Sequence, residues 1–577
     1  MLPRYYNKKL RFYLPILIII ICLLYSVQNI LLTKVNQLEL DKNSINLHKF
    51  SSFNPKFTTS EIIKIINNHE NDGQDQETSI IGDENGIWFH WDDYLDTYPG
   101  NSILQDVKVD DSPCNCSAEM ISYGSVNGYW MESYNKKVLR GMTNVFCIKD
   151  IPSKVYLTTD YNMVEIPVKG KKRFGSLLNN DNLLNFENIN KESLKLKTLP
   201  LKKLSNYKKI DVNDFYFNPD YEIMQLKNQE LDEKQKKYLE FLKYANNIVD
   251  NSDRYFKYPW IITDVVQGNS HHLAYPFFKR FISIRERQSI IQHLVKSWFE
   301  FTEAIDVPSW INYGSLLGWA YNGVNMPWDT DVDVQLPIKS LDYLAQNYNN
   351  TLIIENPKFG NGKFFLDISP TYIKQGNGRN FIDGRFIDIN SGLYIDLSAL
   401  SHTNFKPPKD LDEEFEDDIL VHCKHFNWHS LAEILPIRHT FFEGSPVYIP
   451  NNISSLLSRK YGKESFTTKL HFQNYNYQTD IDLWVADEIC DKSPEIDRFT
   501  DSSEKELTKE GSCDSPILRD EYRINFESIK RHKLLDSDID HPIFQDLEDL
   551  KLSRKDAWDY FNDINRGVGN GDWFHEY

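Results

Sequence analysis

Three aspartates, Asp329, Asp331 and Asp333, alternate with other residues near the end of the segment 311–336. Successive side chains of a β-strand point to opposite faces, so a strand here would place Asp331 and Asp333 on the same face. Neighbouring carboxylates repel each other unless a cation neutralises them, and oxygen ligands suit hard divalent ions such as Mg²⁺ or Mn²⁺. The spacing therefore predicts a divalent-metal site with Asp331 and Asp333 as ligands.

A Gly-Ser pair, Gly314 and Ser315, precedes these aspartates, and we interpret it as a turn. Small residues let backbone N–H groups approach a phosphate closely. Phosphoryl transfer requires that the charge on the phosphate oxygens is neutralised while the nucleophile is held in line. A Gly-Ser pair or a D-x-D alternation alone is weak evidence, but together with a later aspartate strand they indicate chemistry on a phosphate.

The segment 384–400 supplies that later strand. It predicts two strands joined by a turn at 390–392, and Asp396 on the second strand would complete the metal site or accept a proton. A loop of those three residues would place Asp388 on the same face as Asp396. A two-residue loop would place the two aspartates on opposite faces, so the assignment of Asp388 depends on register.

Other charged residues lie near these segments in the sequence. Asp329 has no assigned role beside the pair, and Asp367 is a further candidate carboxylate. Each nearby cation is by itself more often a surface charge than a ligand-binding group. The cations that we consider for phosphate contact are Lys363, Arg379 and Arg385.

These motifs resemble the nucleotidyltransferase pattern, in which a Gly-Ser pair precedes two alternating aspartates and a third aspartate follows. In detail the chain resembles the LicD/fukutin family. The matching segments are NYGSLLGWAYNG, MPWDTDVDV, the YIDLS strand, FEGSPVYIP and KYG. Within the family the chain is most similar to fungal mannosylphosphate-transfer proteins, through GRFIDINSGLYIDLS and HCKHFNWHSLAEILPIRHTFFEG. The resemblance covers residues 255–485.

The resemblance implies an α/β (α+β) fold with a nucleotidyltransferase-like mixed sheet and flanking helices. It also implies transfer of mannose phosphate from GDP-mannose to mannoprotein N- and O-glycans, with Mn²⁺ or Mg²⁺ as cofactor and GMP as product. Asp331 and Asp333 would hold the metal, with Asp396 as third carboxylate. Gly314 and Ser315 would contact phosphate.

Two other functions stay open at this point. The fungal relatives have been described as positive regulators of a separate mannosylphosphate transferase, in which case the chain would bind that enzyme and carry out no turnover. A Golgi glycosyltransferase of the D-x-D type also uses a metal and a sugar nucleotide, although such enzymes usually place an extended nucleotide-binding region before the aspartates. Release of GMP, of GDP or of neither nucleotide separates the three functions.

The N-terminus predicts the compartment. A basic tail at 1–11 precedes an apolar run at 12–32, and the length of that run suits the roughly 20 residues that span a bilayer. No signal-peptide cleavage pattern follows it. We expect a transmembrane signal anchor of a single-pass type II Golgi protein, a polar stem at 33–80 and a luminal catalytic part. The net charge of −18 argues against a nucleic-acid partner.

Sequons and cysteines fit a luminal placement. The sequons at Asn115, Asn349 and Asn452 are candidate glycosylation sites. The cysteines beyond the predicted anchor are even in number and permit three disulfides. They are Cys114, Cys116, Cys147, Cys423, Cys490 and Cys513.

The remaining chain divides into three predicted regions. We expect a β-rich luminal accessory region at 81–225, the LicD-like catalytic domain at 226–485 and an acidic helical C-terminal region at 486–577. A cluster of polar residues at 422–429 is equally consistent with a ligand-binding site and with a surface loop. Its members are His422, Lys424, His425, Asn427 and His429.

Overall fold

The computed structural model describes part of the chain. The described residues are 87–91, 94–95, 121–122, 124–125, 134–171, 197–248, 255–257, 273–278, 282, 284–356, 359–479, 481–487, 516–534 and 554. The predicted anchor and stem, Asn115 and most of the predicted C-terminal region lie outside them. Within them, no helix has both the length and the apolar composition needed to cross a membrane.

The chain forms two compact units. The smaller unit includes residues 96–148 and contributes one helix of full length, α5 (Tyr134–Cys147). The larger unit includes residues 55–95 and 149–577, and the elements described below belong to it.

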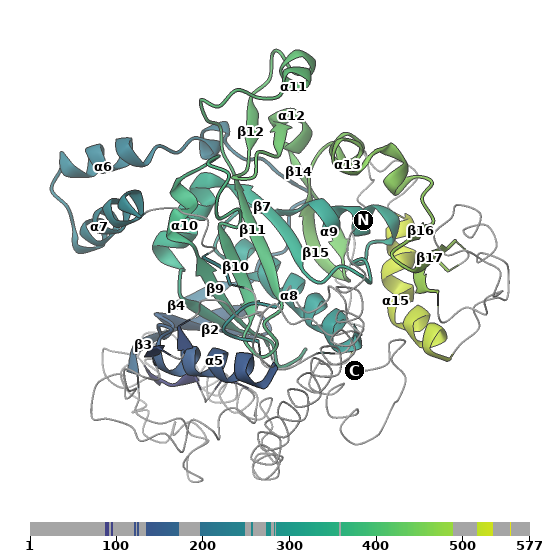
Figure 1. Ribbon diagram of the computed structural model, residues 1–577, viewed down its shortest axis with the longest axis horizontal. Helices are drawn as coiled ribbons and strands as arrows, with labels where there is room; N and C mark the ends of the chain where they lie inside the picture. The colour runs from purple at the N-terminus through teal and green to yellow at the C-terminus, as the bar shows by residue number, and fades with distance from the viewer. Residues whose placement is uncertain are drawn as a thin grey trace, which may run out of the picture. The chain divides into compact units, whose positions relative to one another are not determined.

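A ten-stranded sheet is the centre of the larger unit (Figure 1). Its order is β1-β3-β2-β8-β9-β10-β11-β7-β6, and β4 pairs with β3 outside this path. β7 is parallel to β11 and β2 to β8, whereas successive neighbours from β8 to β11 are antiparallel. The predicted mixed sheet with flanking helices is therefore confirmed. The strands are β1 (Ile87–Phe89), β2 (Lys154–Thr158), β3 (Asn162–Lys171), β4 (Lys197–Pro200), β6 (Trp310–Ile311), β7 (Val332–Pro337), β8 (Thr351–Ile354), β9 (Lys363–Ile368), β10 (Gly384–Asp388) and β11 (Tyr394–Leu400).

Helix α8 (Ile284–Ala304) covers one face of this sheet. The ring of Trp298 lies 5.3 Å from that of Phe386 on β10, and Phe386 lies 5.2 Å from Phe364 on β9. Side chains alternate between the two faces along a strand. Arg385 is next to Phe386 on β10, and Asp367 is three residues after Phe364 on β9, so both point to the opposite face. That opposite face carries the polar site.

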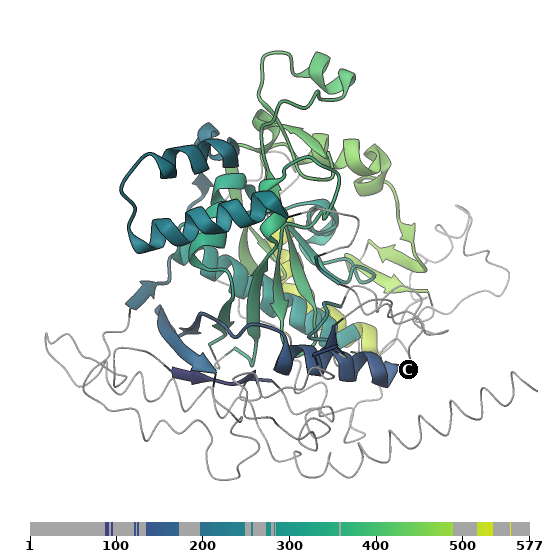
Figure 2. The ribbon, with the colours of Figure 1, turned by 60° about the vertical axis from the view of Figure 1, so that its left-hand side comes forward.

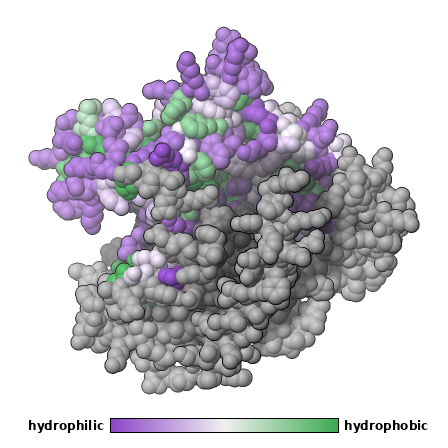
Figure 3. All heavy atoms as spheres, in the orientation of Figure 1, coloured by the Kyte–Doolittle hydropathy of each residue, from purple (hydrophilic) through white to green (hydrophobic). Residues whose placement is uncertain are grey.

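The remaining helices surround the sheet. Helices α6 and α7 pack against each other (Figure 2), and the described surface over α6 and α11 is mainly hydrophilic in the view of Figure 3. The helices are η5 (Val212–Phe215), α6 (Pro219–Lys227), α7 (Glu233–Asn247), α9 (Tyr313–Asn322), α10 (Ile338–Asn347), η6 (Pro370–Ile373), α11 (Lys409–Glu414), α12 (Leu431–Ile434), α13 (Ile453–Tyr461), η7 (Lys463–Phe466) and α15 (Pro516–Leu534).

The strands predicted as a β-rich accessory module do not form a sheet of their own. β2 pairs in parallel with β8, and β3 and β4 continue the same sheet beyond it. β5 (Tyr207–Lys208) pairs with β14 (Ile437–Phe442), which also pairs with β15 (Ser445–Ile449). The pairing of β2 with β8 places Lys154 opposite Thr351. Local sequence patterns carry no information on pairing between segments so far apart in the chain.

Two small antiparallel sheets complete the unit. One contains β12 (Leu420–His422) and β13 (Trp428–Ser430). The other contains β16 (His471–Phe472), β17 (Tyr475–Gln478) and β18 (Leu483–Ala486).

The cysteine prediction needs one correction. Cys147 forms a disulfide, whereas Cys423 is buried and free. Because Cys423 is unavailable, the six cysteines do not form three disulfides. The other four lie outside the described residues.

Candidate carboxylate site

Two aspartates meet on adjacent parallel strands. Asp333 on β7 is in register with Asp396 on β11, and residues in register on neighbouring strands share a face. The strand alternation that suggested a carboxylate pair therefore continues across the sheet. Asp396 is 5% exposed, and Asp333 is partly exposed, so solvent reaches the β7 side of the pair.

A buried arginine lies beside Asp396. Arg385 on β10 is directly opposite Asp396, its Nε lies 2.7 Å from Asp396 Oδ1, and its side chain is 0% exposed. The guanidinium carbon lies 3.6 Å from the centre of the Tyr394 ring. Removing one partner of a buried ion pair leaves an uncompensated charge, so Arg385 and Asp396 depend on each other.

The row continues to β9. Asp367 is opposite Arg385, and it accepts hydrogen bonds from Lys149 Nζ (2.7 Å) and Tyr255 Oη (3.0 Å). Asp333, Asp396, Arg385 and Asp367 thus form a carboxylate row across four strands, with two cations at its β9–β10 end. Sequence reasoning identified Asp367 as a candidate from its strand, but no sequence pattern indicated Lys149 or Tyr255.

The aspartates that precede β7 extend the negative charge. Burial and then the charge of Asp331 raise the pKa of Asp329 well above its usual range. Burial and then its neighbours, Asp331 first, raise the pKa of Asp333 in the same way. Asp329, left without a role at first, therefore lies in the same group of carboxylates. All three of these aspartates are partly exposed.

The Gly-Ser pair is a helix N-terminus and not a turn. Asn312 caps α9 by accepting a hydrogen bond from the Tyr313 backbone N–H, and Gly314 and Ser315 belong to the first helical turn. Ser315 is fully buried, and its Oγ accepts a 3.0 Å hydrogen bond from the backbone N–H of Asp333. The pair therefore fixes α9 against the start of β7.

Gly314 is required by its proximity to a carboxylate. A Cβ at this position would lie 2.4 Å from Asp329 Oδ2, closer than two such atoms can approach. The backbone N–H of Gly314 also lowers the pKa of Asp333, against the larger effect of burial. The positive end of the α9 dipole thus points at the carboxylates.

Asp388 does not join the site. The register of β10 and β11 leaves four residues, 389–392, in the loop, so Asp388 and Asp396 point to opposite faces. Asp388 Oδ2 accepts a 2.8 Å hydrogen bond from the Ser391 backbone N–H and stabilises the loop. The loop is therefore neither the three-residue nor the two-residue alternative, and because Asp388 N–H pairs with Leu393 O, Asp388 faces as the two-residue loop would have placed it.

The two remaining candidate cations differ from Arg385 in position. Lys363 shares the face of Asp367 but begins β9 four residues earlier, about 13 Å along the strand. Its Nζ donates a 2.7 Å hydrogen bond to Asn361 Oδ1. Arg379 lies in the loop between η6 and β10, where its backbone N–H donates to Asn377 Oδ1.

Aromatic residues from α9 and α13 lie on the other side of the carboxylates. Tyr313 accepts a 2.8 Å hydrogen bond from Gln335 Nε2, and its ring lies 5.2 Å from Lys460 Nζ. Burial, followed by the charges of Asp333 and its neighbours, raises the pKa of Tyr461. No chemical motif in the sequence indicated these residues, although Lys460 and Tyr461 belong to KYG, one of the segments that carried the resemblance.

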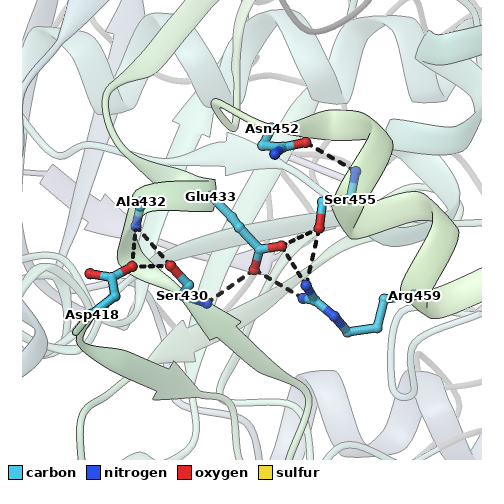
Figure 4. Close-up of polar contacts among 7 residues, drawn as sticks. All are labelled: Asp418, Ser430, Ala432, Glu433, Asn452, Ser455 and Arg459. Atoms are coloured by element: carbon cyan, nitrogen blue, oxygen red, sulfur yellow. Dashed lines mark hydrogen bonds and ion pairs between the residues drawn. The ribbon is translucent and has the colours of Figure 1, made fainter. Parts of the chain in front are cut away.

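A separate polar network around Glu433 connects α12 to α13 (Figure 4). Glu433 Oε2 accepts hydrogen bonds from Arg459 Nη1 (2.9 Å) and the Ser430 backbone N–H (3.1 Å), while Oε1 accepts from Arg459 and Ser455. Burial alone would raise the pKa of Glu433, but these donors more than offset it and the pKa lies below its usual range. This network holds the helix that carries Tyr461.

The polar group near β12 and β13 is not one site. His422 and Lys424 are fully buried, and Lys424 Nζ donates a 2.9 Å hydrogen bond to Thr371 O. His425 is exposed. His429 lies 3.4 Å from Gln335 Nε2, and burial lowers its pKa to about 4.

Two sequons fall within the described residues. Asn349 Oδ1 accepts a 2.9 Å hydrogen bond from the Ile368 backbone N–H. Asn452 caps α13 by accepting from the Ser455 backbone N–H (Figure 4). Glycosylation at either position stays a prediction.

The fit of a divalent metal rests on the donor set. Across the described residues, no three His, Cys, Asp or Glu side chains are spaced as they would be around a bound ion. Burial first, and then the charge of the neighbouring aspartates, raise the pKa values of Asp329 and Asp333. A hard divalent cation bound by oxygen ligands would relieve this repulsion, although these side chains are not spaced around an ion in this structure.

Comparisons with known proteins identify this region. Residues 306–452 match the family described as LicD/FKTN/FKRP, nucleotidyltransferase domain. The chain is 33% identical to Mannosyltransferase regulator 4 of Saccharomyces cerevisiae over 232 residues, which are 38% of this chain and 20% of that protein. It is 37% identical to Mannosyltransferase regulator 14 of the same yeast over 210 residues, which are 34% of this chain and 22% of that protein.

The chain thus spans about a fifth of the length of these curated relatives. Asp329, Asp331, Asp333, Arg385 and Asp396 all lie inside the matched residues. The resemblance inferred from the sequence motifs is therefore confirmed for residues 306–452, the part of the chain that matches the LicD/FKTN/FKRP nucleotidyltransferase domain.

Proposed function

We propose that this domain transfers mannose phosphate from GDP-mannose to mannoprotein glycans and releases GMP. The observation that carries the proposal is the register of Asp333 with Asp396, with Arg385 next in the row. Family membership and the mannosyltransferase regulators among its relatives support a role in mannose phosphate metabolism. The phosphotransfer itself, GDP-mannose as donor and the glycan as acceptor are our proposal.

Each residue of the row has a separate task in this reaction. Asp331 and Asp333 would hold Mg²⁺ or Mn²⁺, and such an ion supplies charge neutralisation to a bound diphosphate. Arg385 fixes the position of Asp396 through the 2.7 Å ion pair. Asp396 would either complete the ligand shell or accept a proton, and both roles agree with its place beside Asp333.

The proposed step balances as a single displacement at phosphorus. A hydroxyl of the acceptor glycan forms a bond to the mannose-bearing phosphorus, and the bond from that phosphorus to the bridging oxygen breaks. The hydroxyl proton passes to a carboxylate of the site, and GMP leaves with the bridging oxygen. Gly314 and Ser315 would support phosphate binding by keeping the α9 N-terminus against β7.

A regulatory function is the second candidate. It is favoured by the names of the two relatives, which are regulators, and by the absence, within the described residues, of three side chains spaced for a metal. A regulator would keep the carboxylate group as a binding surface for a sugar nucleotide or for a separate mannosylphosphate transferase. We propose the Golgi lumen as the location for either function, with the segment 12–32 as a type II anchor.

The experiment uses the purified full chain, an N-glycan acceptor, Mn²⁺ and GDP-mannose labelled at the phosphate that bears mannose. Mannose phosphate transfer moves the label to the glycan, and Asp331→Asn abolishes the movement. A D-x-D glycosyltransferase would transfer mannose and leave the label in GDP. A regulator would leave the label in GDP-mannose, and either of these outcomes would refute the proposal.

A further inference from the structure

Next to the carboxylates lies a group of aromatic side chains that the proposed reaction leaves unused. We call it the aromatic platform and define it as Trp328, Phe472, Tyr475 and Trp484. Trp328 immediately precedes Asp329, and the other members come from the small sheet of β16, β17 and β18. The ring centre of Trp328 lies 4.9–5.3 Å from those of the other three.

The platform is internal on one side and accessible on the other. Tyr475 and Trp484 are each 4% exposed and form its base, whereas Trp328 is only partly buried and Phe472 is 39% exposed. Lys469 is exposed, and its Nζ lies 4.4 Å from the centre of the Phe472 ring. Exposed aromatic surface with a polar group at its edge is typical of ligand-binding sites.

The platform is close to the carboxylates because the chain between them is short. Trp328 lies three residues before Asp331, so their Cα atoms are at most about 11 Å apart. It is tied to α9 by Tyr321, whose ring lies 5.1 Å from that of Trp484. The platform thus adjoins the site from the α9 side of β7.

The charges on the two sides of β7 differ. On the β11 side, the sheet continues to β10 and β9 with charged groups, where Arg385 pairs with Asp396 and Lys149 with Asp367. On the α9 side lie β16 and β17 (Figure 1), and together with β18 and Trp328 they supply the aromatic platform. The four rings of the platform carry no charge, and uncharged rings suit the C–H face of a neutral sugar.

We infer that the aromatic platform binds neutral hexose residues of the acceptor glycan. A hexose ring has a face of C–H groups that stacks on an aromatic ring, and hydroxyls at its edge that accept hydrogen bonds from an amine such as Lys469. The inference rests on the proposed function for its statement that the glycan is the acceptor. The strands β16–β18 follow the residues 306–452 that match the family, so the platform adds a binding surface to the shared domain.

The test measures binding of a neutral α-mannotetraose to the full chain by calorimetry, without sugar nucleotide. Phe472→Ala weakens binding about 3- to 10-fold because one stacking ring is lost, and Trp328→Phe, which keeps a ring, weakens it less. Tyr161→Ala is the matched control, since Tyr161 is 78% exposed on the β2–β3 connection and its loss leaves affinity unchanged. Thermal unfolding confirms that each variant is folded.

Two results would overturn the inference. One is the same tetraose affinity, or no measurable affinity, for the wild type and Phe472→Ala. The other is a platform variant that loses affinity for GDP-mannose and keeps its affinity for the tetraose, because the platform would then stack the guanine base. A chain that binds the tetraose through Phe472 but leaves the phosphate label in GDP-mannose supports the platform and refutes the proposed transferase.

Discussion

The acidic side chains of the Glu433 network and of the carboxylate row differ in how far the protein neutralises their negative charge. Glu433 is 2% exposed, and donors from Arg459, Ser455 and Ser430 satisfy both of its oxygens (Figure 4). Asp333 has three other aspartates around it, and its pKa is raised where that of Glu433 is lowered. Both carboxylates lose water, but only Glu433 gains full compensation from the protein.

We propose that this difference distinguishes a structural carboxylate, Glu433, from a functional one, Asp333. Neighbouring like charges lower the folding stability unless a ligand relieves their repulsion, so such clusters are typical of functional sites. The Glu433 network fixes α12 against α13 and is complete without a ligand. In the carboxylate row, Arg385 neutralises Asp396. At the β7 end of the row we propose that a bound cation and substrate neutralise Asp333.

The largest effect on stability is expected at the one compensated point of the row. Arg385→Met leaves Asp396 buried without its cation and lowers the free energy of unfolding by about 3–5 kcal/mol. Urea denaturation followed by circular dichroism measures the loss. The double variant Arg385→Met with Asp396→Asn recovers part of it, because the uncompensated charge is gone. No recovery in the double variant would contradict the proposed dependence of these two residues.

Glu433→Gln is expected to cost somewhat less. It keeps the shape of the side chain but loses the charge that pairs with Arg459, and the free energy of unfolding falls by about 2–3 kcal/mol. Glu413→Gln on α11 is the matched control, because its pair with Lys409 is exposed and the loss stays within about 0.5 kcal/mol. Equal effects of the two substitutions would remove the contrast between the Glu433 network and an ordinary surface pair.

The pH dependence of stability is expected to reflect His429, which lies between the two groups. Its pKa is about 4 in the folded chain against 6.5 ordinarily, so the unfolded chain binds the proton first. Stability is therefore full above pH 6.5 and decreases as the pH falls towards 4, by about 2 kcal/mol at pH 5. His532 acts in the same direction, since burial also lowers its pKa to about 4. His429→Gln thus removes about half of this pH dependence, and an unchanged profile would show that folding does not shift the pKa of His429.

The smallest stability effect is expected for Asp333→Asn. The substitution removes a like charge and keeps an oxygen that accepts from the Gly314 backbone N–H, so the free energy of unfolding at neutral pH stays equal or rises by up to about 1 kcal/mol. Without added metal, a loss greater than about 1 kcal/mol would mean that the fold already compensates Asp333 as it does Glu433.

The sequence predicted the centre of the site better than its surroundings. The alternation in β7 and the YIDLS strand placed Asp333 and Asp396 correctly on strands, because a two-residue period is local information, whereas Asp331 lies just before β7. Asp388 was undecided, since one loop residue more or less moves a side chain to the other face. The prediction of a turn at the Gly-Ser pair is wrong, because Asn312 acts as an N-cap and a helix begins at Tyr313.

Other features depend on contacts that the sequence does not show. Lys149 and Tyr255 reach Asp367 only because β9 lies beside β10 in the folded sheet. The strands of the expected accessory region join the same sheet through pairing with β8. Both are long-range arrangements, set by packing and not by local propensity.

The most direct test of the central claim is the nucleotide released from GDP-mannose by the full chain with Mn²⁺ and glycan acceptor, wild type against Asp333→Asn. The claim predicts GMP from the wild type and a decrease of about 10³-fold or more in the variant, whose fold is as stable as before. Release of GDP, equal GMP release by both chains, or no nucleotide release from the wild type would contradict it.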